Sequence, residues 1–307
     1  MYLVLLLYAL FASVFTFAKY GLEYAQPFFL VGSRMFLAGI ILIAYQLYKN
    51  LDQIDFRKLP YGKICMLAAF NIYLTNVFEF WGLQYLTSFK ACFIYSLSPF
   101  LSALLSYFVF SETMSKKKWI GLIVGFAGFL PILLNETNNE EQTGHLLLFS
   151  WAEIAVMMAA ACSVYGWILL RQLVKDEALS PLTANGMSML IGGAMALAHS
   201  FAVENWNPVP FTQFVPVLEC TIFLVIISNL ICYNLYGVLL KKYSATFISF
   251  AGFTTPLFTA LYGWFFLGET VTSPFYLSAV IVFAGLFTFY QEELQRDYYA
   301  VANTASN

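Results

Sequence analysis

Charge is scarce in this sequence: Lys, Arg, Asp and Glu together make up 10% of its 307 residues. Because an average soluble domain carries about 25% charged residues, this shortage excludes an ordinary soluble globular protein. The hydrophobic share of 61% excludes intrinsic disorder as well. Lys and Arg number 15 against 17 Asp and Glu, so there is no basic surplus with which to bind nucleic acid.

Residues that carry catalytic or metal chemistry are also few. The two histidines, His145 and His199, have no HExxH, GxSxG or paired-aspartate context, and no Walker sequence is present. We therefore expect neither an enzyme nor a protein driven directly by ATP, and we expect no cofactor. The cysteines lie in apolar runs without CxxC or Cys/His spacing, which predicts buried thiols and no metal site. They are Cys65, Cys92, Cys162, Cys220 and Cys232.

Long apolar stretches fill the chain instead. A bilayer core about 30 Å thick needs about 20 apolar residues per helix, and the sequence offers ten such stretches with only short loops between them. They run over Tyr2–Ala18, Pro27–Tyr48, Cys65–Leu83, Ala91–Phe110, Trp119–Leu134, Leu146–Leu170, Leu182–Ala202, Phe214–Leu239, Ala245–Leu267 and Phe275–Tyr290. The sequence thus predicts an all-α membrane protein with ten transmembrane helices and no separate soluble domain.

The basic residues predict the orientation. If the N-terminus is cytoplasmic, the cytoplasmic loops hold 12 Lys and Arg, whereas the external loops hold only Lys19 and Lys90. Cytoplasmic loops of membrane proteins carry such an excess of Lys and Arg. We therefore expect both termini in the cytoplasm and a plasma membrane location, as in a bacterial inner membrane.

The sequence repeats itself with a period of 157 residues. The stretch Phe93–Leu130 aligns with Phe250–Phe287, so that Pro99 matches Pro256, Glu112 matches Glu269 and Gly128 matches Gly285. Upstream, with one residue of slippage, Asn71-x4-Asn76 matches Asn229-x4-Asn234. Each repeat, residues 1–141 and 142–307, holds five spans, and this odd number places the second repeat upside down in the membrane. Inverted repeats are how secondary transporters build two gates around one central site.

The repeated stretches also resemble a known family. The pattern P-x3-A-L-x7-E, followed by Ala-Gly within the next span, resembles the EamA half of the drug/metabolite transporter superfamily, and the resemblance covers nearly the whole chain in two copies. Arg34 in GSRMFLAG is similar to the Arg-Phe of that family's second span, although Met35 intervenes here. The resemblance implies a ten-helix basket with a central cavity, lined mainly by the third, fourth, eighth and ninth spans.

The resemblance also implies a function. Members of this family with a similar aromatic-rich composition exchange S-adenosylmethionine for S-adenosylhomocysteine, and this exchange is the function we expect for a monomer or homodimer in the lipid bilayer. Export of an amino acid, a nucleoside or a drug, with or without proton coupling, is the alternative within the same family.

Ionisable residues within spans are costly and indicate functional sites. Here they are Arg34, Glu79, Glu153 and Glu219, all at similar depth in the outer half of the membrane. We expect them to form an ion-pair cluster in which Arg34 contacts substrate and the three carboxylates are candidates for ion coupling. The structural alternative is that Arg34 only neutralises one carboxylate and joins two helices.

Polar and aromatic residues within spans complete the predicted site. Tyr73, Asn76 and Glu79 share one helical face, and Asn234 is the repeat partner of Asn76; binding substrate and joining helices are both open to these residues. Asn71 and Asn229, about 140° further round the helix, are expected to face elsewhere. Aromatic residues within spans pack the core or wall a cavity that binds an organic cation by cation–π attraction. They include Tyr95, Trp167, Tyr233, Tyr236 and Trp264, of which Tyr95, Trp167 and Trp264 join the predicted binding set.

Two prolines and two glutamates mark the repeated spans. Pro99 and Pro256 interrupt the helical hydrogen-bond ladder within their spans, which predicts gating hinges. Glu112 and Glu269 occupy turns and are expected to cap the following helix. Gly121-x3-Gly125 predicts a close helix-packing face.

Overall fold

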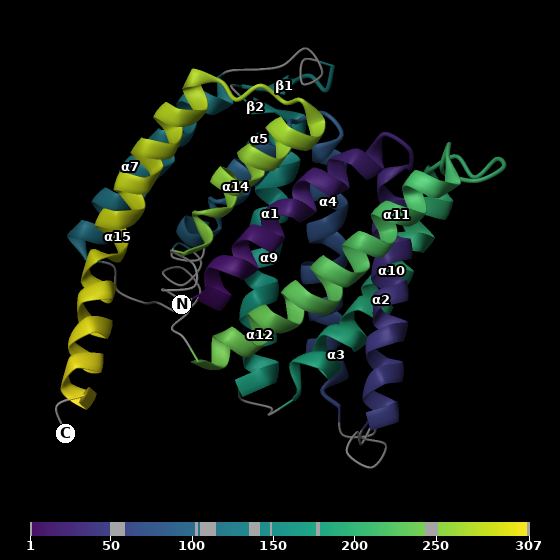
Figure 1. Cartoon of the computed structure of the whole chain (residues 1–307), viewed down its shortest axis with the longest axis horizontal. Coiled ribbons are helices and arrows are strands. Elements are labelled where there is room, and N and C mark those ends of the chain that lie inside the picture. Colours follow the sequence, from purple (N-terminus) through teal and green to yellow (C-terminus); the bar gives the residue numbers. More distant parts are fainter. Residues whose placement is uncertain are drawn as a thin grey trace.

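The computed structural model shows a bundle of helices with one short β-hairpin (Figure 1). It describes residues 2–49, 59–101, 104, 115–134, 142–147, 149–175, 179–242 and 251–305, and their side chains except those of 175, 240–242 and 292–305. The elements are α1 (Tyr2–Leu22), α2 (Pro27–Lys49), α3 (Tyr61–Leu67), η2 (Ala68–Leu74), α4 (Thr75–Leu83), α5 (Ser88–Tyr95), α7 (Lys116–Leu133), β1 (His145–Leu146), β2 (Phe149–Ser150), α9 (Trp151–Lys175), α10 (Pro181–Val203), α11 (Phe214–Leu224), η3 (Val225–Cys232), α12 (Tyr233–Lys242), α14 (Thr255–Tyr262), η4 (Gly263–Leu267) and α15 (Ser273–Ala305).

The helices are those of a membrane protein. Within the described residues, 7 helices are long and apolar enough to cross a membrane, counting α3–η2–α4 and α11–η3–α12 as one helix each. The described parts of the predicted fourth, fifth and ninth spans are the shorter helices α5, α7 and α14–η4. The predicted multi-span helical membrane fold is confirmed.

Corresponding spans of the two halves of the chain pack against each other. The second spans of the halves pack together (α2 on α10), as do the fourth (α5 on α14) and the fifth (α7 on α15). The third span of each half packs on the first span of the other, α4 on α9 and η3 on α1. Figure 1 shows the α7–α15 pair at one edge of the bundle and the α2–α10 pair at the other.

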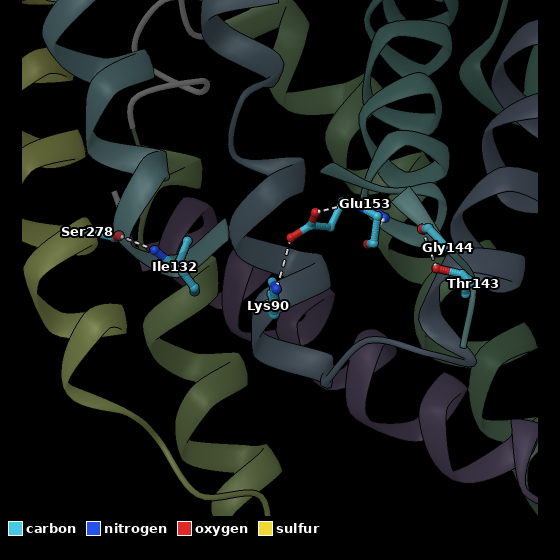
Figure 2. A network of polar contacts seen from close by, with 7 residues as sticks. Lys90, Ile132, Thr143, Gly144, Glu153 and Ser278 are labelled. Atoms are coloured by element: carbon cyan, nitrogen blue, oxygen red, sulfur yellow. Dashed lines mark hydrogen bonds and ion pairs between the residues drawn. The ribbon is translucent and has the colours of Figure 1, made fainter. Parts of the chain in front are cut away.

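Glycines bring the paired helices into backbone contact. A Cβ on Gly121 would lie 2.6 Å from the carbonyl oxygen of Gly285, and one on Gly285 would lie 2.5 Å from the backbone nitrogen of Gly125. The predicted packing face on α7 is thus confirmed, because no other residue fits so close an approach. The backbone N–H of Ile132 in α7 also donates to Ser278 Oγ in α15 at 3.1 Å (Figure 2).

The two ends of the bundle differ. The β-hairpin lies at one end, together with the turns that join α1 to α2 and α4 to α5 (Figure 1). The C-terminal ends of α2, α9 and α12, which close on Lys49, Lys175 and Lys242, lie at the opposite end. Basic residues therefore gather at the end opposite the hairpin.

Cysteine and lysine placements differ from the sequence predictions. Lys19, which was expected in an external loop, lies within α1. Cys65 is exposed, whereas the other four cysteines are buried as predicted. Lys90 is a buried residue of α5, not a loop residue, because this helix begins at Ser88, before the apolar stretch on which the prediction relied.

Candidate functional site

Two π-helical segments interrupt the third and eighth spans at matching positions. The segment η2 contains Asn71 and the segment η3 contains its repeat partner Asn229. Short π-helical stretches of this kind are frequent at functional sites. The duplicated sequence has thus kept the same backbone irregularity in both halves, near the middle of each helix.

One asparagine in each half bonds the carbonyl groups of its π-helix. Asn76 Nδ2 donates to the carbonyls of the residues four and five positions earlier, at 2.7 and 3.3 Å. Asn234 Nδ2 does the same at 2.9 and 3.2 Å. Each amide oxygen then accepts from the second span of its half: Asn76 from Arg34, Asn234 from Asn185 Nδ2 at 3.1 Å. Both asparagines therefore support the helix and join it to a neighbour.

Arg34 connects the two halves. Its Nη2 donates to Asn76 Oδ1 at 2.6 Å, and its Nη1 donates to Asn229 Oδ1 at 3.3 Å. The guanidinium lies over the Phe80 ring, 4.6 Å from the ring centroid. Arg34 is only 1% exposed, and its Nε has no hydrogen-bond partner within the described part of the chain. A buried cation with an unused donor is suited to binding an anion.

Glu79 provides the opposite charge in the same place. Its buried carboxylate lies close enough to Arg34 for electrostatic attraction, although the described contacts include no ion pair between the two. Tyr233 is close enough to both charges for electrostatic interaction, and its hydroxyl forms a hydrogen bond with the Asn76 side chain. We call Arg34, Asn76, Glu79, Asn229 and Tyr233 the Arg34 cluster.

Aromatic rings adjoin the cluster through Tyr233. The Trp167 ring of α9 lies 4.3 Å from the Tyr236 ring and 5.3 Å from the Tyr233 ring, measured between centroids. Phe11 of α1 packs against both tyrosines at 6.5 Å. These four residues form the aromatic wall. Tyr95 also lies near Glu79, and its ring packs on Phe15 at 5.9 Å.

The structure therefore brings together Arg34, Asn76, Glu79, Tyr95 and Trp167 of the predicted set, with Asn234 one helical turn beyond Asn229. Tyr73 lies elsewhere: its hydroxyl contacts His199 Nδ1 at 3.2 Å. Trp264 is 61% exposed, and none of the described ring contacts or hydrogen bonds joins it to the Arg34 cluster.

The predicted cluster of four charges does not form. Glu219 is exposed on α11. Glu153 pairs with Lys90 at 2.9 Å instead of with Arg34 (Figure 2). Of the three carboxylates, only Glu79 is beside Arg34.

Asn229 corrects a further prediction, since it contacts Arg34 instead of facing elsewhere. The estimate of about 140° assumed an α-helix, whereas i→i+5 bonding widens the turn and brings residues five apart nearer to one face. Asn71, by contrast, packs against Gly166 of α9, and neither polar atom of its amide has a partner in the described residues.

Both prolines follow a break in a helix. The chain turns at Ser96–Leu97 before Pro99 and at Phe253–Thr254 before Pro256, which is the same position in each repeat. Glu269 caps a helix as predicted, but the helix is α5 and not the following α15. Glu112 lies outside the described residues.

Several residues of the site could not be singled out from the sequence. Phe80, Tyr233, Tyr236 and Phe11 were not in the predicted binding set, because apolar and aromatic residues are common in every span. The one available signal was the position of Tyr233 directly before Asn234. No group of three or more His, Cys, Asp and Glu in the described residues could hold a metal ion.

Comparisons with known proteins agree with this architecture. The model of the EamA-like transporter family matches residues 1–134 and again residues 150–291. A protein of Chlamydia muridarum named as an S-adenosylmethionine/S-adenosylhomocysteine transporter is 39% identical, covering 94% of this chain and 90% of the relative. A protein of the same name from Chlamydia trachomatis serovar L2 is 38% identical, covering 94% of this chain and 88% of the relative. A crystal structure with 14% identity matches 94% of this chain and 93% of its own, with a TM-score of 0.65. With two family matches that together span most of its length, this chain belongs to the EamA-like transporter family.

Proposed function

We propose that this protein exchanges S-adenosylmethionine for S-adenosylhomocysteine across the membrane. The observation that carries the proposal is the 39% identity, over 94% of the chain, to the Chlamydia muridarum transporter of these two molecules. In this proposal the repeats, residues 1–141 and 142–307, expose one central site to the two sides in turn.

The Arg34 cluster suits the amino-acid part of both molecules. Each carries a carboxylate and an ammonium group on one carbon atom. Arg34 has an unused donor, Nε, for the carboxylate, and the Glu79 carboxylate would accept from the ammonium. Hydrogen bonds to charged groups are the stronger ones, and a buried setting increases their electrostatic part. This arrangement supports Arg34 and Glu79 as the pair that holds the zwitterion.

The aromatic wall suits the rest of the molecule. Adenine presents a flat face that stacks on rings such as those of Trp167 and Tyr236. The sulfonium of S-adenosylmethionine is a cation that the face of an aromatic ring attracts. S-adenosylhomocysteine keeps the adenine and the zwitterion but lacks the sulfonium charge, so both molecules would use the same contacts. Tyr95, which lies near Glu79 and packs on Phe15, is the further aromatic residue that we include in the binding set.

The distribution of the basic residues supports the membrane orientation that we propose. Twelve of the Lys and Arg residues would lie in cytoplasmic loops if both termini are cytoplasmic. We propose that orientation, with the hairpin end outside, in a bacterial inner membrane. Hinge motion at the turns before Pro99 and Pro256 would let the fourth and ninth spans open the two ends.

A proton-coupled exporter of an amino acid, nucleoside or drug is the second candidate, favoured by one observation: Glu79 is a buried carboxylate beside a cation. A proton-driven carrier needs such a group to take up and release a proton, whereas an exchanger does not. The Glu79→Gln variant would abolish pH-driven transport in an exporter. In an exchanger it would weaken substrate binding without making transport depend on the pH gradient.

Purified protein in liposomes tests the proposal. We expect saturable uptake of radiolabelled S-adenosylmethionine that increases when the liposomes contain S-adenosylhomocysteine. Arg34→Ala should abolish it, whereas Lys49→Ala, a matched loss of one cation from the exposed end of the same helix, should not. Absence of uptake by correctly inserted wild-type protein would disprove this pair of substrates.

A further inference from the structure

The turn between α4 and α5 is held by polar contacts from three other parts of the chain. The first comes from α1: Lys19 Nζ donates to the carbonyls of Leu83 and Gln84 at 2.7 and 2.9 Å. These carbonyls close α4, where the helix dipole favours a cation. Lys19 therefore joins the end of the third span to the first span.

The second contact comes from the other half of the chain. Glu269, in the turn between η4 and α15, accepts from the backbone N–H of Ser88 at 2.8 Å and from Ser88 Oγ at 2.6 Å. Ser88 begins α5, and a carboxylate at a helix N-terminus is stabilised both by the free N–H groups and by the dipole. Gly263 leaves room for the contact, since a Cβ there would lie 2.5 Å from Glu269 Oε2.

The third contact is the buried ion pair between Lys90 of α5 and Glu153 of α9 (Figure 2). The two side chains are 3% and 0% exposed, and Lys90 Nζ lies 2.9 Å from Glu153 Oε1. The other carboxylate oxygen accepts from the backbone N–H of Ser150 at 2.8 Å, which fixes the carboxylate at the start of α9. Removal of one partner of such a pair leaves the other charge buried and uncompensated.

The contacts form two layers. A pocket of about 230 Å³ reaches the contacts of Lys19 and Glu269 but not the Lys90–Glu153 pair; its lining is Lys19, Glu23, Tyr85, Leu86, Thr87, Leu267 and Glu269. The outer layer is thus open to water, while the inner ion pair is dry. Loosening the outer layer would expose the inner pair to water, which weakens the attraction between its charges.

We infer that these contacts form a latch that keeps the hairpin end of the transporter closed, and that Lys90 and Glu153 are its central residues. Opening this end requires α5 to separate from α9 and from the Glu269 turn, so all the contacts of α5 must break together. The turn at Ser96–Leu97, which interrupts the helix, allows the first turns of α5 to move without the rest of the span. This inference rests on the proposed alternating access but not on the identity of the substrate.

The ion pair of the latch has no counterpart in the repeated sequence. In the 157-residue register the repeat partner of Lys90 is Phe247, which cannot form an ion pair. The equivalent contact at the opposite end therefore lacks this charge attraction. We expect the transporter without substrate to remain closed at the hairpin end for most of the time, while the opposite end opens more readily.

Cys92, a buried residue of α5 two positions after Lys90, provides a native reporter of opening. The other four cysteines are replaced by serine, and a membrane-impermeant maleimide is added from the hairpin side of intact cells. We expect Glu153→Gln and Lys90→Met each to raise the labelling rate of Cys92 by about tenfold or more, because each leaves a buried charged or polar group unpaired. Glu219→Gln, which removes an exposed carboxylate, should leave the rate unchanged.

The double variant Lys90→Glu/Glu153→Lys, which exchanges the two charges, distinguishes the loss of a latch from a general loss of structure. We expect it to return the labelling rate toward that of the wild type. Unchanged rates in both single variants, or equal increases from both sides of the membrane, would overturn the inference. The labelling needs no substrate, so its failure leaves the proposed exchange untouched, and failure of the exchange leaves the labelling result interpretable.

Discussion

The third and eighth spans have the same backbone but different partners. In each span, the side chain of the second asparagine of the repeated motif, Asn76 or Asn234, donates to backbone carbonyl groups of a π-helical segment. In the third span that asparagine accepts from a guanidinium, whereas in the eighth it accepts from the amide of Asn185. Asn229 of the eighth span also accepts from Arg34, while the side-chain amide of its partner Asn71 has no hydrogen bond among the described residues.

This difference separates the features that both repeats share from those that only one repeat has. The π-helices and their asparagine bonds occur in both halves, so they are part of the shared fold. The charges Arg34 and Glu79 occur in the first half only, since Gly237 follows Asn234 where Glu79 follows Asn76. The Arg34 cluster therefore lies on a nearly symmetric frame but is itself asymmetric, as expected if it binds a substrate that has no symmetry.

Replacing Arg34 should produce the largest effect. Arg34→Ala removes two charge-assisted hydrogen bonds and the proposed partner of the substrate carboxylate, which at about 1.5–3 kcal/mol each predicts at least a hundredfold loss of exchange. Arg34→Lys keeps the charge but loses the planar fork, so an intermediate loss is expected. Initial rates of exchange in liposomes measure both. Near-normal exchange by Arg34→Ala would leave only a structural role for the cluster.

Trp167→Ala tests the contribution of the second half. Loss of one stacking ring costs about 1–3 kcal/mol, so the KM for S-adenosylmethionine should rise by about tenfold or more. Trp264→Ala is the matched control, because that ring is 61% exposed and should leave KM unchanged. Equal effects of the two changes would contradict the position of the aromatic wall.

Asn76→Ala and Asn234→Ala compare the two halves directly. Each variant removes the side-chain hydrogen bonds to the carbonyl groups of one π-helical segment. We expect both to lower the melting temperature by similar amounts, since the net contribution of a hydrogen bond to stability is about 0.5–1.5 kcal/mol. Only Asn76→Ala also releases Arg34. Exchange should therefore fall several-fold more in Asn76→Ala than in Asn234→Ala, and similar losses would show that Arg34 does not depend on Asn76.

Asn229→Ala and Asn71→Ala should produce the smallest effects. Asn229→Ala removes the longer of the two bonds to Arg34 and should raise KM a few-fold. Asn71→Ala removes an amide without partners, so its free energy of unfolding should change little or rise. Thermal unfolding and KM measured on the same preparations decide the comparison. A strong loss of exchange in Asn71→Ala would indicate a role for this amide that the other contacts do not explain.

Most of the architecture could be predicted from the sequence. Span length and the 157-residue repeat follow from hydrophobicity and identity, which do not depend on exact helix geometry. Arg34, Asn76 and Glu79 could also be singled out without knowledge of the helix geometry, because a charge or an amide within an apolar run is costly and therefore conspicuous.

The errors arose where the angle around a helix mattered. The π-helices change the angular position of every later residue, and the sequence carries no direct sign of them, so the contacts of Asn229 and Tyr73 were mispredicted. The faces of Glu219 and Trp264 depend on which neighbours cover α11 and η4, which is a property of the packed bundle. Lys90 was misplaced because a buried carboxylate, Glu153, permits a charged residue within a helix where hydrophobicity alone predicts a loop.

The two-fold packing of the halves has an evolutionary consequence. If each half were a separate chain that paired antiparallel with an identical copy, every residue would be present twice, on both sides of the axis. A guanidinium in the position of Arg34 would then face a second one across the interface, and the lysine–carboxylate pair would recur at both ends. Joining the two copies in one gene removes that constraint, since each half can then mutate alone. A single arginine and a one-ended ion pair are features that a symmetric pair of identical chains cannot have.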